Sequence, residues 1–110
     1  MKQKKIIEQA WNDKSLLNDK STINAIEEVI EKLDKGELRI AEQINNEWVI
    51  NEWVKKAVVL YFPIRKMETI EVGPLEFHDK MKLKSDYKSL GVRVVPHAIA
   101  RYGAFVASGV

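Results

Sequence analysis

The feature that most constrains the fold is a segment, residues 53–62, that is apolar over almost its whole length. It reads Trp-Val-Lys-Lys-Ala-Val-Val-Leu-Tyr-Phe, so only Lys55 and Lys56 provide a polar side. A helix that is apolar on nearly every face is stable only when other elements cover it. Asn51 can cap its start, and β-branched residues leave a strand over its second half as the alternative. We predict a buried central helix that ends before Pro63, because proline disfavours helical geometry in the residue before it.

Two amphipathic segments precede this helix in the sequence. Residues 22–35 form the clearest helix, with apolar side chains on one face and charged side chains on the other. Ser21 or Asn24 can cap its start, and Gly36 suits the left-handed conformation that ends a helix. Apolar residues at helical spacings of three and four also predict a shorter helix over residues 3–12.

Strand patterns lie on either side of the central helix. Residues 38–44 alternate apolar and polar side chains, Asn45-Asn46 can form a two-residue turn, and residues 47–50 return as the partner strand. Residues 69–72 form another short strand. The charged stretch from 79 to 88 is predicted to lie in solvent.

The last stretch, from Tyr102 to Val110, alternates small, large and β-branched residues. An extended apolar strand with an open edge normally pairs with a neighbour. Short strands with small residues at tight corners are typical of a left-handed parallel β-helix, whose coils need stacked neighbours to bury their inner faces. We therefore predict an α+β fold. A small, mostly helical N-terminal domain with a β-hairpin spans residues 1–92, and residues 93–110 form the junction and first coil of a truncated left-handed β-helix.

Composition narrows the classes of function. The chain has 110 residues, which is one small domain, and 18 Lys and Arg against 16 Asp and Glu give a net charge of +2. A charge this small argues against a nucleic-acid binder. The chain has no cysteine and two histidines, which argues against a metal site or a cysteine nucleophile. No apolar run has the length of a signal peptide or a membrane span, so we expect a cytoplasmic protein without a membrane partner.

Five blocks of the sequence carry a resemblance to a known family. They are residues 37–42 (Glu-Leu-Arg-Ile-Ala-Glu), Trp48-Val49, residues 53–62, residues 91–96 (Gly-Val-Arg-Val-Val-Pro) and residues 101–105 (Arg-Tyr-Gly-Ala-Phe). Because these blocks occur in this order and at this spacing, the chain resembles the N-terminal domain of the tetrahydrodipicolinate N-succinyltransferase family. The resemblance includes the junction of that domain with a β-helix domain. The resemblance covers nearly the whole chain, and it is weakest around His78, where the segment is shorter than in the family.

The resemblance implies a trimeric acyltransferase of lysine and diaminopimelate biosynthesis. Such an enzyme moves a succinyl group from succinyl-CoA to the amino group of ring-opened tetrahydrodipicolinate. In the family, the coenzyme site and the acid/base carboxylates lie in the β-helix, between subunits. The resemblance therefore implies that this chain is the substrate-side part, inactive alone, with no catalytic residue, cofactor or metal of its own. Its expected partners are the dicarboxylate substrate, succinyl-CoA and further copies of the chain.

Arg93 is the one residue to which the resemblance gives a substrate-binding role. It falls on the family arginine of the Arg-Val-Val-Pro motif, which binds the dicarboxylate substrate. A guanidinium presents a planar fork that can hold one carboxylate through two hydrogen bonds. Such positioning lowers the entropic part of the barrier without forming a bond.

The other cationic side chains have structural interpretations. Arg101 is predicted to pair with an acidic residue at the domain junction. Lys55 and Lys56 are predicted to form the one solvated stripe of the central helix rather than to bind a coenzyme A phosphate. The basic run of Lys80, Lys82, Lys84 and Lys88 is interrupted by acidic residues and is predicted to be a solvated loop.

The histidines and tryptophans are also interpreted structurally. Neither His78 nor His97 has a serine or a carboxylate at a diagnostic spacing, which argues against a general base, although histidine titrates near neutrality. Trp11, Trp48 and Trp53 each belong to an apolar stripe or strand, and we predict that they anchor the core.

The sequence alone also permits a function of another class. The chain could be a stand-alone interaction module or a split-gene remnant that pairs with a partner chain through its C-terminal strand. Its size in solution and the coding sequence downstream would separate this interpretation from the first.

Overall fold

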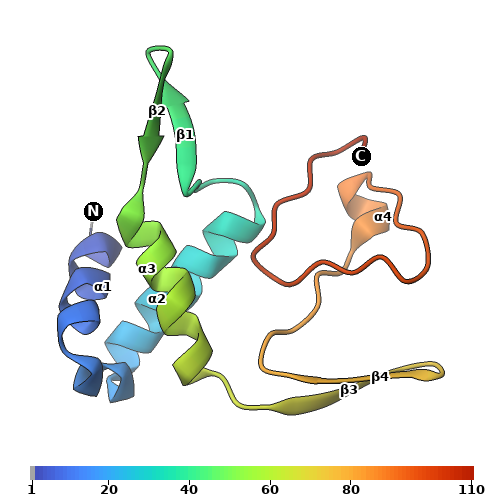
Figure 1. The fold of residues 1–110 in the computed structure, drawn as a ribbon, viewed down its shortest axis with the longest axis horizontal. Helices are drawn as coiled ribbons and strands as arrows, with labels where there is room; N and C mark the ends of the chain where they lie inside the picture. The colour runs from blue at the N-terminus through green and yellow to red at the C-terminus, as the bar shows by residue number, and fades with distance from the viewer. Residues whose placement is uncertain (1) are drawn as a thin grey trace.

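The computed structural model describes residues 2–110 (Figure 1). The elements follow in the order α1 (Lys2–Asn12), the 3-10 helix η1 (Lys14–Asn18), α2 (Lys20–Asp34), β1 (Ala41–Ile44), β2 (Glu47–Ile50), α3 (Glu52–Ile64), β3 (Glu68–Val72), β4 (Leu75–Asp79) and α4 (Tyr87–Leu90). The strands form two separate two-stranded antiparallel sheets, so the predicted α+β class is confirmed. None of the helices in residues 2–110 is both long enough and apolar enough to cross a membrane.

The helices α1, α2 and α3 pack around one apolar core (Figure 1). Its buried side chains include Ile7 and Ala10 of α1, Ile26, Val29 and Ile30 of α2, and Val54, Ala57 and Leu60 of α3. The apolar segment 53–62 is therefore helical and largely buried, as predicted, and the strand alternative for its second half is wrong. A helix satisfies its own backbone hydrogen bonds, so this segment can enter the core without a neighbouring strand.

The start of α2 differs from the prediction, whereas its end agrees. The helix begins at Lys20, and Asp19 occupies the cap position in extended backbone without a side-chain hydrogen bond. The predicted caps are wrong, because Ser21 and Asn24 lie inside the helix. Gly36 follows the helix at φ +78°, which is the left-handed conformation that favours glycine.

Both ends of α3 depart from the prediction in detail. Asn51 lies at the predicted cap position, but its side-chain amide donates to the carbonyl oxygen of Arg39 at 2.8 Å instead of capping the helix. The helix continues through Pro63 to Ile64, so the predicted end before Pro63 is wrong. Proline lacks an N–H and therefore removes one hydrogen bond. In this last turn the helix still closes through the N–H of Arg65, which donates to the carbonyl oxygen of Phe62 at 3.1 Å.

The predicted β1–β2 hairpin is confirmed. Its turn is formed by Asn45 at φ 52° and Asn46 at φ 66°, the positive values that a two-residue hairpin turn requires. The hairpin projects away from the helices (Figure 1), and the side chain of Trp48 is 70% exposed. The prediction that Trp48 anchors the core is wrong, because no other element of the described residues 2–110 covers this hairpin. Trp53 is buried and Trp11 packs against the core, as predicted.

A second hairpin follows α3. The predicted strand at residues 69–72 is confirmed as β3, and it pairs with β4, which the sequence pattern did not predict. Gly73, at φ +57°, and Pro74 connect the two strands.

Residues 91–110, which we call the C-terminal loop, form an open circuit beside the helical core (Figure 1). Turns occur at residues 96–97, 102–103 and 108–109, six residues apart. The circuit returns to its start, since the N–H of Arg93 donates to the carbonyl oxygen of Val110 at 2.8 Å. The strands expected over 93–110 are not formed in the structure, because a single circuit has no neighbouring strand with which to bond.

Candidate functional site

Arg93 lies where the C-terminal loop leaves α4. That helix ends at Leu90 and is capped by Gly91, which has φ +73°. The N–H of Val92 closes the turn onto the carbonyl oxygen of Tyr87 at 2.9 Å. The backbone of Arg93 is held by its hydrogen bond to Val110, whereas its side chain is exposed. Within residues 2–110 no carboxylate forms an ion pair with Arg93. Its guanidinium is therefore available to an outside ligand.

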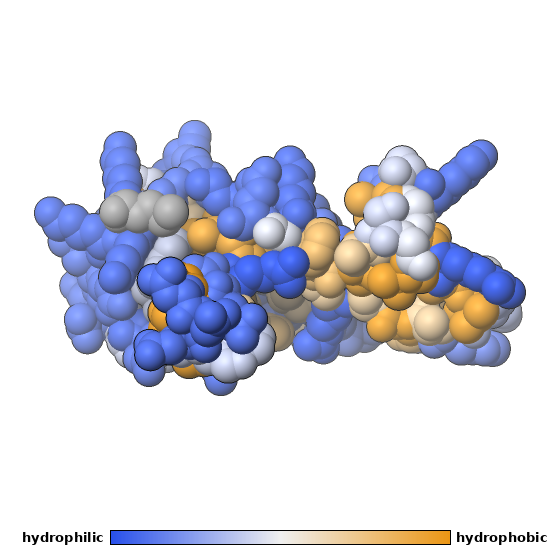
Figure 2. Space-filling view, turned by 90° about the horizontal axis from the view of Figure 1, so that it is seen from above, coloured by the Kyte–Doolittle hydropathy of each residue, from blue (hydrophilic) through white to orange (hydrophobic). Residues whose placement is uncertain are grey.

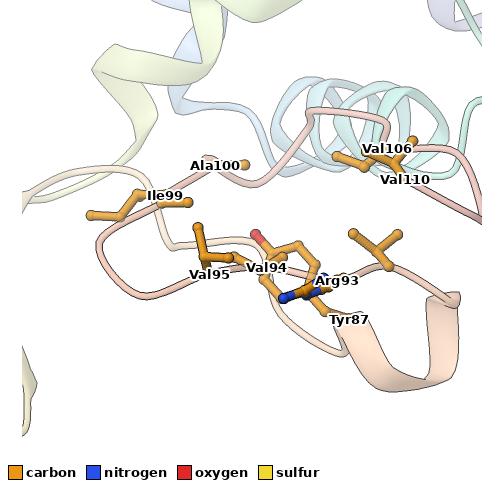
Figure 3. Close-up of a pocket in the computed structure, with 10 residues that line it drawn as sticks. Tyr87, Arg93, Val94, Val95, Ile99, Ala100, Val106 and Val110 are labelled. Carbon is orange, nitrogen blue, oxygen red and sulfur yellow. The ribbon is translucent and has the colours of Figure 1, made fainter.

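The side chain of Arg93 borders an apolar groove of about 480 Å³ on the C-terminal loop. Its lining residues are Tyr87, Val92, Arg93, Val94, Val95, Ala98, Ile99, Ala100, Val106 and Val110 (Figure 3). Figure 2 shows the same end of the molecule as a gathering of hydrophobic surface. Charges attract one another more strongly beside low-dielectric walls than in water. The groove can therefore hold a molecule that joins an apolar body to a carboxylate.

A buried ion pair joins the C-terminal part of the chain to the end of α2. The ammonium group of Lys84 donates to the Oδ1 atom of Asp34 at 2.9 Å, and the N–H of Gly103 donates to the same oxygen at 2.9 Å. The side chain of Lys84 is only 3% exposed. The prediction that the whole basic run is solvated is therefore wrong for Lys84, because Asp34 neutralises its charge inside the protein.

A second polar contact lies beside this ion pair. The phenol of Tyr102 donates to the carboxylate of Glu31, and the ammonium group of Lys82 lies over the Tyr102 ring at 4.0 Å. Burial raises the pKa of the Tyr102 phenol well above its usual range, and the hydrogen bond to Glu31 raises it further. The same hydrogen bond lowers the pKa of the Glu31 carboxyl.

A third contact, made by the aromatic ring of Phe105, also joins the C-terminal loop to the end of α2. A methyl group built on Gly36 would lie 2.8 Å from the ring of Phe105, so the backbone and the ring touch directly. The guanidinium of Arg39 covers the same ring at 4.5 Å from its centroid. Together with the two polar contacts, this packing holds the C-terminal loop, which also carries Arg93, beside the end of α2.

Of the remaining cationic candidates, Arg101 and the exposed Lys55 agree with their predictions, whereas Lys56 is half-buried and not part of a solvated stripe. Arg101 forms an ion pair with Asp79 at 2.9 Å, which confirms the predicted partner of opposite charge. Lys56 pairs with Glu8 at 2.9 Å.

The structure does not bring either histidine into the groove. His78 lies on β4, where its Nδ1 atom is 3.1 Å from the hydroxyl of Thr69 on the paired strand. His97 occupies an exposed turn at φ 75°. No group of three or more His, Asp or Glu side chains able to hold a metal occurs within residues 2–110.

Sequence reasoning missed the residues of the junction. Asp34 and Lys84 are 50 positions apart, and Glu31 and Tyr102 are 71 positions apart. No local pattern marks such pairs. The one sequence feature that could have indicated this ion pair was Lys84 itself. The charged residues on both sides of it made the whole run look solvated.

These observations define a small α+β domain that carries an open apolar groove with a free guanidinium. Residues 2–64 match the family model described as tetrahydrodipicolinate N-succinyltransferase N-terminal. The chain therefore belongs to this family.

Individual relatives agree with this assignment. The protein of Coxiella burnetii is 46% identical over 112 residues, that of Legionella pneumophila (strain Paris) is 42% identical over 112 residues, and that of Bordetella pertussis is 40% identical over 114 residues. Each is named 2,3,4,5-tetrahydropyridine-2,6-dicarboxylate N-succinyltransferase. The matches cover 93–94% of this chain and 41–42% of each relative, so the chain spans about two fifths of the length of these relatives.

Proposed function

We propose that this chain is the substrate-side N-terminal part of a succinyl-CoA-dependent tetrahydrodipicolinate N-succinyltransferase. Its family membership and the names of its relatives support the proposal. The acyl-CoA site and the groups that move the proton then lie in the part of the relatives that this chain does not span. The enzyme serves lysine and diaminopimelate biosynthesis in the cytoplasm and works as a trimer.

In this proposal Arg93 binds one carboxylate of the dicarboxylate substrate. The observation that carries it is the free guanidinium at the border of the apolar groove. The planar fork can hold a carboxylate through two parallel hydrogen bonds, and the apolar walls can contact the aliphatic part of the substrate. Arg93 then fixes the direction in which the substrate amino group meets the succinyl thioester, which makes it a binding residue and not a proton carrier.

The C-terminal loop is proposed to be the first coil of a left-handed parallel β-helix. Turns six residues apart and the return of Val110 to Arg93 support this assignment, because β-helix coils of this type are built from hexapeptides. The exposed apolar side chains of the loop would be covered by the next coil, since a single repeat cannot bury its own hydrophobic face.

The test compares this chain alone with a fusion to the remaining part of the Coxiella burnetii relative. Succinyl transfer from succinyl-CoA is followed by the release of free thiol. We expect no turnover from the chain alone and turnover of roughly 1 s⁻¹ or more from the fusion. A relative that lacks its own N-terminal part is the control and should be inactive. Turnover by the chain alone, or a folded fusion without activity, would contradict the proposal.

A further inference from the structure

The segment that leads into the C-terminal loop, residues 82–90, pairs with one edge of that loop. The N–H of Lys84 donates to the carbonyl oxygen of Ala100 at 2.9 Å. The N–H of Tyr102 donates to the carbonyl oxygen of Lys82, also at 2.9 Å. These two hydrogen bonds flank an isolated antiparallel bridge. An unpaired strand edge is a template for pairing with another chain, so the segment occupies an edge that would otherwise attract one.

The opposite edge of the loop is different. Ladder hydrogen bonds of successive residues point to opposite edges of a strand. Because Ala100 and Tyr102 bond to the segment, the N–H of Arg101 between them faces the other edge, and it has no backbone acceptor within residues 2–110. One edge of the loop is therefore paired, and the other is open to a further coil.

The side chain of Tyr87, at the start of α4, enters the circuit of the C-terminal loop from the same segment. It lines the apolar groove together with Val92, Ala100 and Val106, the half-buried aliphatic residues of the loop. Figure 3 shows its ring pointing from α4 toward Val94, and α4 lies within the outline of the circuit in Figure 1. The ring thus covers apolar surface at the centre of the circuit.

Backbone contacts fix α4 to the loop. Asp86, at φ 65°, and Gly91, at φ 73°, turn the chain before and after the helix. The N–H of Gly109 donates to the carbonyl oxygen of Gly91 at 2.8 Å. A methyl group built on Gly91 would lie 2.6 Å from the Oγ atom of Ser108. The end of α4 is therefore in direct contact with the turn that closes the circuit.

We propose that residues 82–90 are an end cap for the first coil of the β-helix. Residues 82–84 pair with the edge of the coil, Tyr87 covers its centre, and the exposed Lys88 and Ser89 give the end cap a polar outer surface. Repeat proteins need such a polar end, because an uncapped repeat exposes the surface on which further repeats stack. Further coils add only on the opposite side, and another chain cannot stack on the capped end. This inference rests on the coil assignment made under the proposed function.

The first test uses the chain alone and needs no enzymatic activity. Hydrogen exchange followed by NMR measures the opening of the loop at the amides of Arg93 and Tyr102, which are both hydrogen-bonded. We expect Tyr87→Ala to speed exchange at both amides by roughly tenfold or more, because apolar contacts are lost. Tyr87→Phe keeps the ring, and Lys88→Ala is the matched control on the outer surface. Both should exchange as the parent does.

The second test uses the fusion to the remaining part of the Coxiella burnetii relative, in which the following coils cover the opposite end. Analytical ultracentrifugation at increasing concentrations should give one constant mass for this fusion. Its Tyr87→Ala variant should form larger species as the concentration rises, because end-to-end contacts between copies do not close. Tyr87 lies outside the helical core, so circular dichroism should show that each variant is folded.

Several results would overturn the proposal. Exchange that Tyr87→Ala leaves unchanged, or that Lys88→Ala speeds as much, would show that the ring does not hold the coil. A parent fusion whose mass grows with concentration would show that the α4 end is open, and a Tyr87→Ala fusion of constant mass would show that the ring keeps no other copy away. Turnover of the fusion reports on the proposed function separately, so an active fusion with any of these results would remove the end cap alone.

Discussion

The buried ion pair between Asp34 and Lys84 gives the sharpest prediction about stability. Asp34→Ala removes the only carboxylate that pairs with the Lys84 ammonium within residues 2–110, and this ammonium is almost fully buried. Removing one partner of a buried ion pair costs about 3–5 kcal/mol, because the other charge stays in the interior without compensation. The change also removes the acceptor of the Gly103 N–H.

This cost can be measured by urea and thermal unfolding, followed by circular dichroism and by tryptophan fluorescence. For a domain of this size, 1 kcal/mol corresponds to roughly 4–8 °C in Tm, so Asp34→Ala should lower Tm by at least about 12 °C. Lys84→Met should cost less, about 1–3 kcal/mol, because Asp34 is partly exposed and keeps the hydrogen bond from Gly103.

A double-mutant cycle tests the reasoning independently of either single cost. The variant with both changes should be more stable than the sum of the single costs predicts, by about 1–3 kcal/mol. The reasoning would be refuted if Asp34→Ala cost less than about 1 kcal/mol, which is the range of an exposed ion pair. Strictly additive costs would also refute it.

Three further predictions concern the junction. Gly36→Ala should cost about 2 kcal/mol or more in urea unfolding, because its φ of +78° disfavours a side chain and the new methyl group would meet the Phe105 ring. Gly73→Ala is its control and should cost less, since φ is also positive there but nothing lies within 4 Å; equal costs would show that the Phe105 contact is unimportant. Tyr102→Phe should make the free energy of unfolding depend less on pH, both at acidic and at alkaline pH. The pKa of Glu31 is lowered by folding, so its contribution is present above its unfolded value of about 4.5 and is lost as the pH falls. The pKa of Tyr102 is raised by folding, so its contribution to stability is present below a pH of about 10 and is lost as the pH rises. A variant whose stability depends on pH as the parent's does would contradict this linkage. Arg101→Ala should change stability by less than about 1 kcal/mol, because its ion pair with Asp79 is half-exposed, and a larger loss in thermal unfolding would assign Arg101 a further role.

The sequence patterns that predicted the fold correctly were local. The apolar stripe of residues 22–35 and the nearly uniform apolar character of 53–62 predicted α2 and α3, because helical periodicity determines which side chains can face a core. The Asn45-Asn46 turn predicted the β1–β2 hairpin for a similar reason, since few residues tolerate positive φ. Helix ends were predicted less accurately, because several residues near each end can serve as caps and helix ends vary by one or two residues.

The parts that the sequence could not predict depend on distant contacts. The burial of Lys84 requires Asp34, which lies 50 positions earlier, and no periodicity connects the two. A tryptophan in a predicted strand is expected to be a core residue. Trp48 is exposed because the hairpin projects away from the helices. Arg93 stays a prediction that came from its motif, and the structure adds the groove and the absence of an ion-pair partner within residues 2–110.

The most direct test of the account is the KM for the dicarboxylate substrate in the active fusion and in its Arg93→Lys variant. Lysine keeps the charge and loses the planar fork. We predict that the KM for the dicarboxylate rises by roughly tenfold to a hundredfold, the equivalent of one charged hydrogen bond, while the KM for succinyl-CoA stays the same. An unchanged KM for the dicarboxylate, in a variant that folds as the parent does, would contradict the role given to Arg93 and with it the substrate-side assignment of this domain.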